Sequence, residues 1–361
     1  VFMDYLKKNT LKLLNIFFIF LLISGCSKFQ YLVEQGMGQA SLFLKAKKNQ
    51  DVLDDPLTSE EVKKKIKQIQ AYKSYFYKFF QRIPKGHYEK TTILDREAVT
   101  YLVTASPFNK IEPKEECFPF VGCFPYLGFF DKKSAIKYKN VLEKNNWVTW
   151  VRPVYAYSTL GNFNDPILSS FFRYNDEVLA ELIFHELFHS LFFIENEVQL
   201  NENLANFFSK KLVAIYFNWS EARKDQKVRE RSRYKGLDKL IVHLVKKLEN
   251  KYSRVQEKDK TKFEEVLKSF LEHHFEPKIR SYCSSNDLLP NRCYPLQRKW
   301  NNASFAGFLT YEEESQKIEN LERKLGLNLL NFYIYIENKH KEYLENKLET
   351  PFSNYLFSSL D

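Results

Sequence analysis

The chain has 361 residues, of which 44% are hydrophobic and 28% are charged, and its formal net charge is +10. This length suffices for one large or two small folded domains, and the composition excludes a chain that is disordered throughout. Much of the basic excess lies in residues 221–262, which hold 15 Lys and Arg against 7 Asp and Glu. We interpret this segment as a solvated helical face or a contact with anionic lipid headgroups, and we expect no nucleic-acid partner.

Residues 1–25 have the pattern of a lipoprotein signal peptide. Three lysines precede an apolar stretch at 13–23, which is too short for a membrane span and suits the apolar core of a signal sequence. The stretch ends in Ile-Ser-Gly-Cys, which resembles a bacterial lipobox, so Cys26 is the predicted lipidation site. An uncleaved N-terminal anchor is the alternative. Either way we expect a lipid- or membrane-anchored protein of the bacterial cell envelope that faces the periplasm or the cell surface, and Ser27 favours the outer membrane.

The segments that follow predict helices with one small sheet. Helices are expected at 31–50, at 57–82 with Ser59 near its start, and at 132–145. Strands are expected at 98–103, 126–130 and 147–157, the last with a break at Pro153. Further helices are expected at 175–194 with Asn175 or Asp176 as the cap, at 203–217, at 221–275 with a bend near Gly236, and at 301–340. We therefore predict an α+β fold, mostly helical, as one domain over 26–361 with a helical insertion at about 221–275.

Four cysteines remain after the signal region: Cys117, Cys123, Cys283 and Cys293. An even number in an exported chain fits two disulfides, and the sequence-near pairs are the simplest of three connectivities. Free thiols are the alternative. A zinc site made of the four cysteines is not expected, because the chain lacks a C-x-x-C spacing.

His185-Glu186-Leu187-Phe188-His189 forms an H-E-x-x-H motif. On a helix, residues i and i+4 share one face, so both imidazoles can bind one metal ion. Glu186 can then serve as the general base for a water activated by that metal. The motif predicts a Zn²⁺ site in a peptide hydrolase, and the alternative is an apolar core helix that carries two histidines without metal.

A catalytic zinc usually has three protein ligands, and the third is expected downstream. We select Glu202, in the segment Asn201 to Asn206 that is predicted to begin a new helix, because Glu195 and Glu197 are too close to the first helix to fold back. Asn206 is a candidate acceptor for the hydrogen bond that the second ring nitrogen of a metal-bound histidine donates. Tyr157 and Tyr311 are candidate donors to the oxyanion.

Several of these stretches together resemble the bacterial family of predicted aminopeptidases, many of which carry lipobox signals. The specific part comprises Ala156 to Gly161, Asp165-Pro166, the H-E-x-x-H motif and Asn201-Glu202. Looser similarity at Gly36 to Gln39, around Cys117 and Tyr126 to Phe130, and at Asn301 to Ala303 with Tyr311 extends the resemblance over most of the mature chain. The N-E-x-x-A context of Glu202 also resembles the glutamate-ligand zincins, although the gap after His189 is shorter than in their larger members.

The resemblance implies a zincin-like metallopeptidase domain with His185, His189 and Glu202 as zinc ligands and Glu186 as base. Ser158, Thr159, Leu160 and Gly161 are compatible with an edge strand that pairs with an extended peptide substrate, or with a purely structural strand and turn. The residues alone do not reveal an acidic group for the ammonium of an aminopeptidase substrate. We expect a membrane-anchored zinc peptidase, first an aminopeptidase, and alternatively an endopeptidase of envelope proteins or a non-catalytic envelope scaffold.

Overall fold

The computed structural model describes residues 26–118, 122–156, 159, 163–256, 259–309, 315–347 and 350–358. The first three described helices are α2 (Cys26–Leu44), α3 (Asn49–Asp54) and α4 (Glu60–Phe79). They confirm the predicted helix at 57–82. The helix predicted at 31–50 is correct only as far as Leu44, because Lys47–Lys48 form a short strand before α3 begins. Ser59 caps α4, since its hydroxyl accepts a hydrogen bond from the Val62 N–H at 3.4 Å. Gly38 lets α2 approach the ring of Phe130 so closely that a side chain there would clash.

The predicted sheet is present and antiparallel. Its central strand is β3 (Thr100–Ser106), flanked by β6 (Leu127–Phe129) and β7 (Val148–Val154), and α5 (Lys132–Lys144) packs against it. The predicted break at Pro153 is wrong, because Pro153 pairs with Tyr101 inside β7. β7 is an edge strand of this sheet, where the missing N–H of a proline can be tolerated.

Two smaller sheets were not predicted. One joins β1 (Lys47–Lys48), β2 (Lys90–Thr92) and β8 (Ile167–Leu168), and the other is the pair β4 (Glu116–Phe118) and β5 (Gly122–Phe124). Strands of two or three residues are too short to show an alternating pattern, which explains why they were missed. The β4–β5 pair carries the Cys117–Cys123 disulfide, and a second disulfide joins Cys283 to Cys293, so both predicted pairings are confirmed.

Helices α6 (Asp176–Leu191) and α7 (Val198–Tyr216) follow a short 3₁₀ turn at Ser169–Arg173 and pack against each other. With α4 they enclose an aromatic core to which α12 (Ser315–Leu325), α13 (Leu329–Glu345) and α14 (Phe352–Phe357) also contribute. The rings of Phe188 and Phe208 stack in it with their centroids 4.7 Å apart. The position of α6 is therefore fixed by aromatic side chains on several sides.

The remaining helices are α8 (Glu221–Tyr252), α9 (Lys260–Phe270), α10 (Glu276–Ser285) and α11 (Asn302–Leu309), with a π-helical turn at Leu271–Phe275 and 3₁₀ turns at Pro290–Arg292 and Tyr294–Gln297. The predicted bend near Gly236 is wrong, because α8 continues through this residue without interruption. Gly236 instead makes room for the Tyr282 hydroxyl, which donates to the Arg233 carbonyl at 2.9 Å. The region 301–340, predicted as helical, is divided among three helices.

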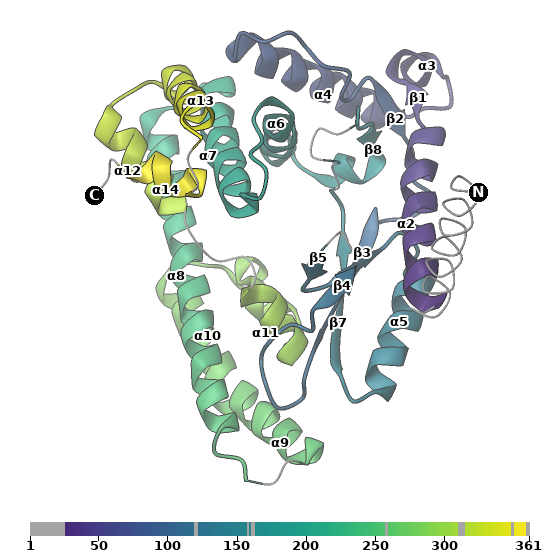
Figure 1. Ribbon diagram of the computed structural model, residues 1–361, viewed down its shortest axis with the longest axis vertical. Coiled ribbons are helices and arrows are strands. Elements are labelled where there is room, and N and C mark those ends of the chain that lie inside the picture. Colours follow the sequence, from purple (N-terminus) through teal and green to yellow (C-terminus); the bar gives the residue numbers. More distant parts are fainter. Residues whose placement is uncertain are drawn as a thin grey trace, which may run out of the picture.

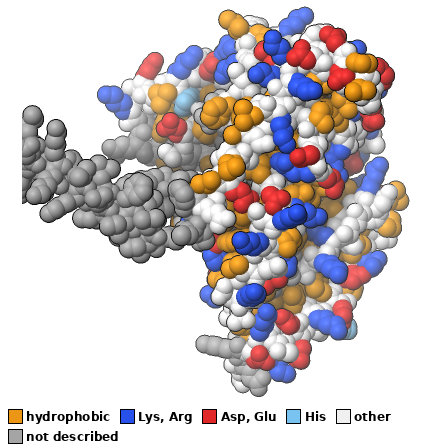
Figure 2. Space-filling view, turned by 90° about the vertical axis from the view of Figure 1, so that its right-hand side faces the viewer, with side chains coloured by type: hydrophobic (Ala, Val, Ile, Leu, Met, Phe, Trp, Pro, Cys, Tyr) orange, Lys and Arg blue, Asp and Glu red, His pale blue; other side chains and the backbone are white. Residues whose placement is uncertain are grey.

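Figure 1 shows the strands with α2 and α5 on one side of the molecule, α7, α8 and α12 to α14 on the other, and α4 and α6 above. α11 packs on β3 and β7, and Asn302 at its start donates to the carbonyls of Pro107 and Phe108, both at 2.9 Å. The mostly helical α+β prediction is confirmed. On the face seen in Figure 2, basic and acidic side chains are interspersed among apolar ones. Among the described helices, none combines the length and apolarity that a membrane crossing requires.

Candidate metal centre

The H-E-x-x-H motif lies in the last two turns of α6. Asn175 caps this helix as predicted: its side-chain oxygen accepts a hydrogen bond from the Val178 N–H at 3.0 Å. The buried side chains of Leu179, Ile183 and Leu187 attach one face of α6 to the aromatic core. The opposite row of side chains, spaced by four residues, is left for polar groups and ends in His185 and His189.

Glu202 reaches the histidines from α7, which begins at Val198 rather than at the predicted residue 203. Glu202 therefore lies in the second turn of the helix and not at its start. The connection from α6 is held by Asn201, whose side chain accepts from the Ile194 N–H at 3.0 Å and donates to the Ile194 carbonyl at 2.7 Å. Asn196 has a positive φ of 61°, which lets the short connection turn sharply.

The three predicted ligands lie together. The Nε2 atoms of His185 and His189 are 3.2 Å apart, and oxygens of Glu202 lie 3.4 Å from the first and 3.3 Å from the second. Ligand atoms about 2.0–2.1 Å from a tetrahedral zinc ion are about 3.3 Å from each other. The distance to His185 is measured from Oε2 of Glu202 and the distance to His189 from Oε1, and each is close to the separation of two ligand atoms in a tetrahedral zinc site. This two-imidazole, one-carboxylate set suits zinc.

The site is closed on one side and open on the other. The imidazole of His189 is 1% exposed and that of His185 is 17% exposed, whereas the Glu202 side chain is 43% exposed. Burial opposes ionisation of Glu202, but its hydrogen bonds with His185 and His189 outweigh burial and lower the pKa of this carboxyl to about 2. Glu202 is therefore ionised at neutral pH, and a molecule can approach the site from its side.

The two glutamates that were rejected as ligands are placed elsewhere. Glu197 accepts hydrogen bonds from the N–H of Ser353, at 2.9 Å, and from its hydroxyl, which joins α7 to α14. Glu195 is exposed in the connection before α7. A second group of metal-ligand types, Glu115 with Cys117 and Cys123, is not free for a metal because both cysteines form a disulfide.

Asn206 lies one turn after Glu202 and is partly buried. Within the described residues its side chain has no hydrogen bond to either imidazole, and the buried Nδ1 atom of His189 has no hydrogen-bond partner there. A metal-bound histidine normally donates this second nitrogen to an acceptor. That Asn206 accepts a hydrogen bond from a metal-bound histidine stays a prediction.

Glu186 is partly buried next to His185 and lies near Tyr88, which sequence reasoning missed. Burial raises the pKa of the Tyr88 hydroxyl well above its usual value, and the carboxylate of Glu186 adds to the rise. The Tyr88 backbone has a positive φ of 60° and is held on both sides: its N–H donates to the Asp165 carbonyl at 2.7 Å, and its carbonyl accepts from the Asn49 side chain at 2.8 Å. No sequence pattern identifies this tyrosine, because it reaches Glu186 only through the fold.

Most of the predicted substrate segment lies outside the described residues, namely Tyr157, Ser158, Leu160 and Gly161, and so does Tyr311. Thr159 is described, and its N–H and hydroxyl both donate to the buried carboxylate of Asp165 at 2.9 Å. The backbone carbonyl of Asp165 also accepts the hydrogen bond from the Tyr88 N–H. Asp165 therefore connects Thr159 to the surroundings of Glu186. Cys26 is the first residue of α2, and its side chain also lies outside the described part.

Part of the basic segment 221–262 forms ion pairs with α6, the helix of the H-E-x-x-H motif. Arg223 and Lys227 of α8 lie 3.1 and 3.3 Å from the carboxylate of Glu177, two turns before His185. Arg231 lies 3.9 Å from Glu181, one turn before His185. These positive charges thus help to position α6, a role that the composition alone did not reveal.

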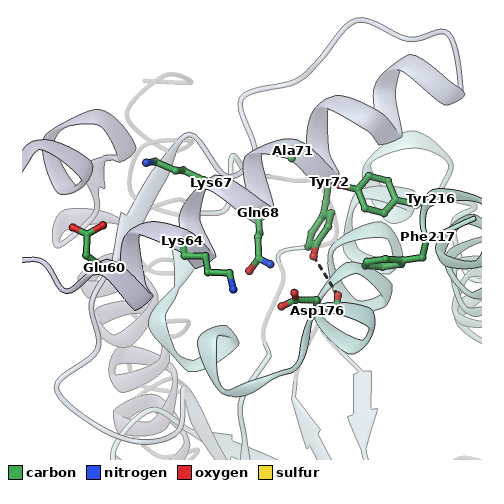
Figure 3. A pocket seen from close by; sticks show the side chains of 9 residues that line it. All are labelled: Glu60, Lys64, Lys67, Gln68, Ala71, Tyr72, Asp176, Tyr216 and Phe217. Atoms are coloured by element: carbon green, nitrogen blue, oxygen red, sulfur yellow. Dashed lines mark hydrogen bonds between the residues drawn. The ribbon is translucent and has the colours of Figure 1, made fainter.

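A surface pocket of about 500 Å³ lies at the other end of α6 (Figure 3). Its lining comes from α4, α6 and the end of α7: Glu60, Lys64, Lys67, Gln68, Ala71, Tyr72, Asp176, Tyr216 and Phe217. The Tyr72 hydroxyl donates to the Asp176 carbonyl there, and the Lys65 ammonium group donates to the Asp176 side chain at 3.0 Å. Asp176 is about 14 Å before His185 along the helix axis. The pocket therefore lies at the N-terminal end of α6, away from the candidate metal centre.

The sequence model of a protein family described as "Putative aminopeptidase" matches residues 30–348. Neither the curated proteins nor the solved structures contain a match to the chain.

Proposed function

The chain belongs to the family of putative aminopeptidases, and we propose that it is a zinc-dependent aminopeptidase of the bacterial cell envelope. The sequence resemblance is confirmed by this match, and the family name suggests a peptidase. The observation that supports the zinc assignment is the group of His185, His189 and Glu202, whose nearest ligand atoms are 3.2–3.4 Å apart, with Glu186 beside His185 on the same helix.

In this proposal His185, His189 and Glu202 hold the metal. Zinc, when bound, polarises the scissile carbonyl and makes water a better nucleophile near neutral pH. Glu186 accepts the proton of the attacking water and delivers it to the nitrogen of the leaving amine. Hydrogen bonds with the two histidines keep Glu202 ionised. The buried core behind His189 excludes solvent from the closed side of the site.

The residues outside the described part complete the proposal. Tyr157 and Tyr311 are the candidate donors to the developing oxyanion. Ser158 to Gly161 would pair with the backbone of an extended peptide, and the bond between Thr159 and Asp165 supports this by fixing one residue of the segment. Lipid on Cys26 would anchor the enzyme to the membrane, which rests on the lipobox-like tetrapeptide and is tested by acyl labelling of the parent and of Cys26→Ser.

The first experiment measures metal content and peptidase activity of the purified full chain. We expect about one zinc per chain, lost in His189→Ala and in Glu202→Ala and kept in the matched control Glu195→Ala. Glu186→Gln should keep its zinc and lose at least about 100-fold in kcat. A parent that holds no zinc even after loading would contradict the hydrolase and favour the envelope scaffold.

Peptides with free and blocked N-termini separate the two peptidase classes. An aminopeptidase should cleave only the free peptide, because it must bind the terminal ammonium group. Equal cleavage of both would replace the aminopeptidase by the endopeptidase without changing the zinc assignment.

A further inference from the structure

Two rows of polar side chains extend from the metal centre along the facing helices α6 and α7. Each row consists of residues spaced by four: Glu177, Glu181, His185 and His189 on α6, and Glu202, Asn206 and Lys210 on α7. Residues with this spacing form one ridge on a helix surface. Glu202 faces both histidines, and the short connection makes the helices antiparallel, so Lys210 lies toward Glu181.

Lys210 is a partly buried cation without an ion pair. Among the described residues no carboxylate oxygen lies within 4.0 Å of its ammonium group. Burial lowers the pKa of Lys210, the charges of Glu181 and Glu319 raise it, and the charge of Arg231 lowers it. The neighbouring Lys211 differs, since it donates to both oxygens of Glu322 at 2.6 Å.

Arg231 approaches the same place from α8. Its guanidinium is 3.9 Å from Glu181, which is longer than a hydrogen bond, and the side chain is 42% exposed. Within the described part of the chain its N–H groups form no hydrogen bond, so they can bind a carboxylate through the two parallel hydrogen bonds that a guanidinium offers. A partly buried ammonium without a partner gains most from an anion that brings its own negative charge.

We propose that Lys210 and Arg231 bind a carboxylate group of the peptide substrate. The inference rests on the proposed peptidase function and adds a substrate class to it. The negative charges of Glu181 and Glu319 also act on Lys210 and weaken the attraction of this place for anions in general. An anion must therefore form direct hydrogen bonds to bind here, as a carboxylate can.

The distance from the metal centre sets the length of the substrate. Lys210 follows Glu202 by eight residues, which is about 12 Å along the helix axis. An extended peptide covers about 3.3–3.6 Å per residue, and the lysine side chain reaches part of the way. The carboxylate therefore lies about two or three residues from the scissile bond. It is either the C-terminus of a short peptide or the side chain of an Asp or Glu.

The test measures binding rather than turnover. The zinc-loaded full chain with Glu186→Gln is titrated calorimetrically with three peptides: tetra-alanine as free acid, its C-terminal amide, and the amide with Glu at the last position. We expect the free acid to bind about tenfold more tightly than the amide. Adding Lys210→Met should remove this difference, whereas Lys210→Arg and the matched control Lys211→Met should keep it. Zinc content and circular dichroism check that each variant is folded.

Two results would overturn the inference: equal affinities for acid and amide in the parent, or an undiminished difference in folded Lys210→Met. A Glu-containing amide that binds like the free acid would extend the subsite to side-chain carboxylates, and one that binds like the plain amide would restrict it to C-termini. Cleavage by the chain with native Glu186 separates this from the proposed function. If that chain cleaves acid and amide peptides equally well, only the carboxylate subsite fails, and if it cleaves neither, the peptidase itself fails.

Discussion

The two helical parts of this protein are stabilised by different means. Around α6 and α7 the core is aromatic and surrounds α6, which carries the H-E-x-x-H motif, from several directions. Around α8, α9 and α10 a smaller core is closed by the Cys283–Cys293 disulfide. Rigidity is needed in the first of these parts, because two imidazoles and a carboxylate keep separations of 3.2–3.4 Å only if both helices are fixed by packing.

The largest effect is expected when the aromatic core is opened behind the metal ligands. Phe188→Ala removes a fully buried ring that stacks on Phe208, directly before His189. It should lower the free energy of unfolding by about 3–5 kcal/mol and weaken zinc binding, since the cavity loosens α6. Chemical denaturation and zinc titration measure both. The control Phe193→Ala changes a ring that is 42% exposed and should cost less than about 0.5 kcal/mol. Equal effects of the two variants would show that stacking does not hold the site.

The second prediction concerns the disulfide of the other part. The Cys283–Cys293 bond closes a loop over a sequence separation of 10 residues, which corresponds to a stabilisation of about 3 kcal/mol. The double variant Cys283→Ser with Cys293→Ser should lower the unfolding free energy by about this amount and speed proteolysis near α10. Zinc content should remain that of the parent. Loss of zinc in this variant would mean that the two helical parts unfold as one unit.

The third prediction is a pH dependence in the metal-binding part. Burial, with help from Lys85 and Lys73, lowers the pKa of His87 from 6.5 to about 4. The unfolded chain then binds a proton that the folded chain excludes, so the stabilisation is complete above pH 6.5 and is lost as the pH falls toward 4. We expect a loss of about 2–3 kcal/mol between pH 7 and 4.5 in zinc-free protein, measured by denaturation at both values. His87→Gln should flatten this slope, and an unchanged slope would assign it to other groups.

The sequence predicted what depends on local spacing. His185, Glu186 and His189 with the cap Asn175 lie within one helix, and a helix has the same geometry wherever it occurs. Glu202 follows after a short connection, so its approach to the histidines needed only two adjacent helices. The disulfides were predictable from cysteines that lie close in the chain, and the sheet of β3, β6 and β7 from the local patterns of its strands.

What the sequence did not reveal depends on distant contacts. Tyr88 reaches Glu186 through a strained backbone that Asp165 and Asn49 hold in place. Gly236 was expected to bend a helix because glycine has low helix propensity, but packing against Tyr282 needs its small size. Lys210 could have been identified from its spacing to Glu202, whereas the approach of Arg231 from α8 could not.

The smallest expected effect separates the two parts most cleanly, because it compares equivalent hydrogen bonds. Asn175 caps α6 by accepting from the Val178 N–H at 3.0 Å, and Ser220 caps α8 by accepting from the Arg223 N–H at 3.3 Å. Asn175→Ala and Ser220→Ala should each cost about 1 kcal/mol in unfolding free energy. Only Asn175→Ala should weaken zinc binding, since its helix carries two of the ligands, and Asn175→Asp should restore it by capping again. If Ser220→Ala weakens zinc binding equally, the ion pairs from α8 to Glu177 hold the metal helix as firmly as its own cap does.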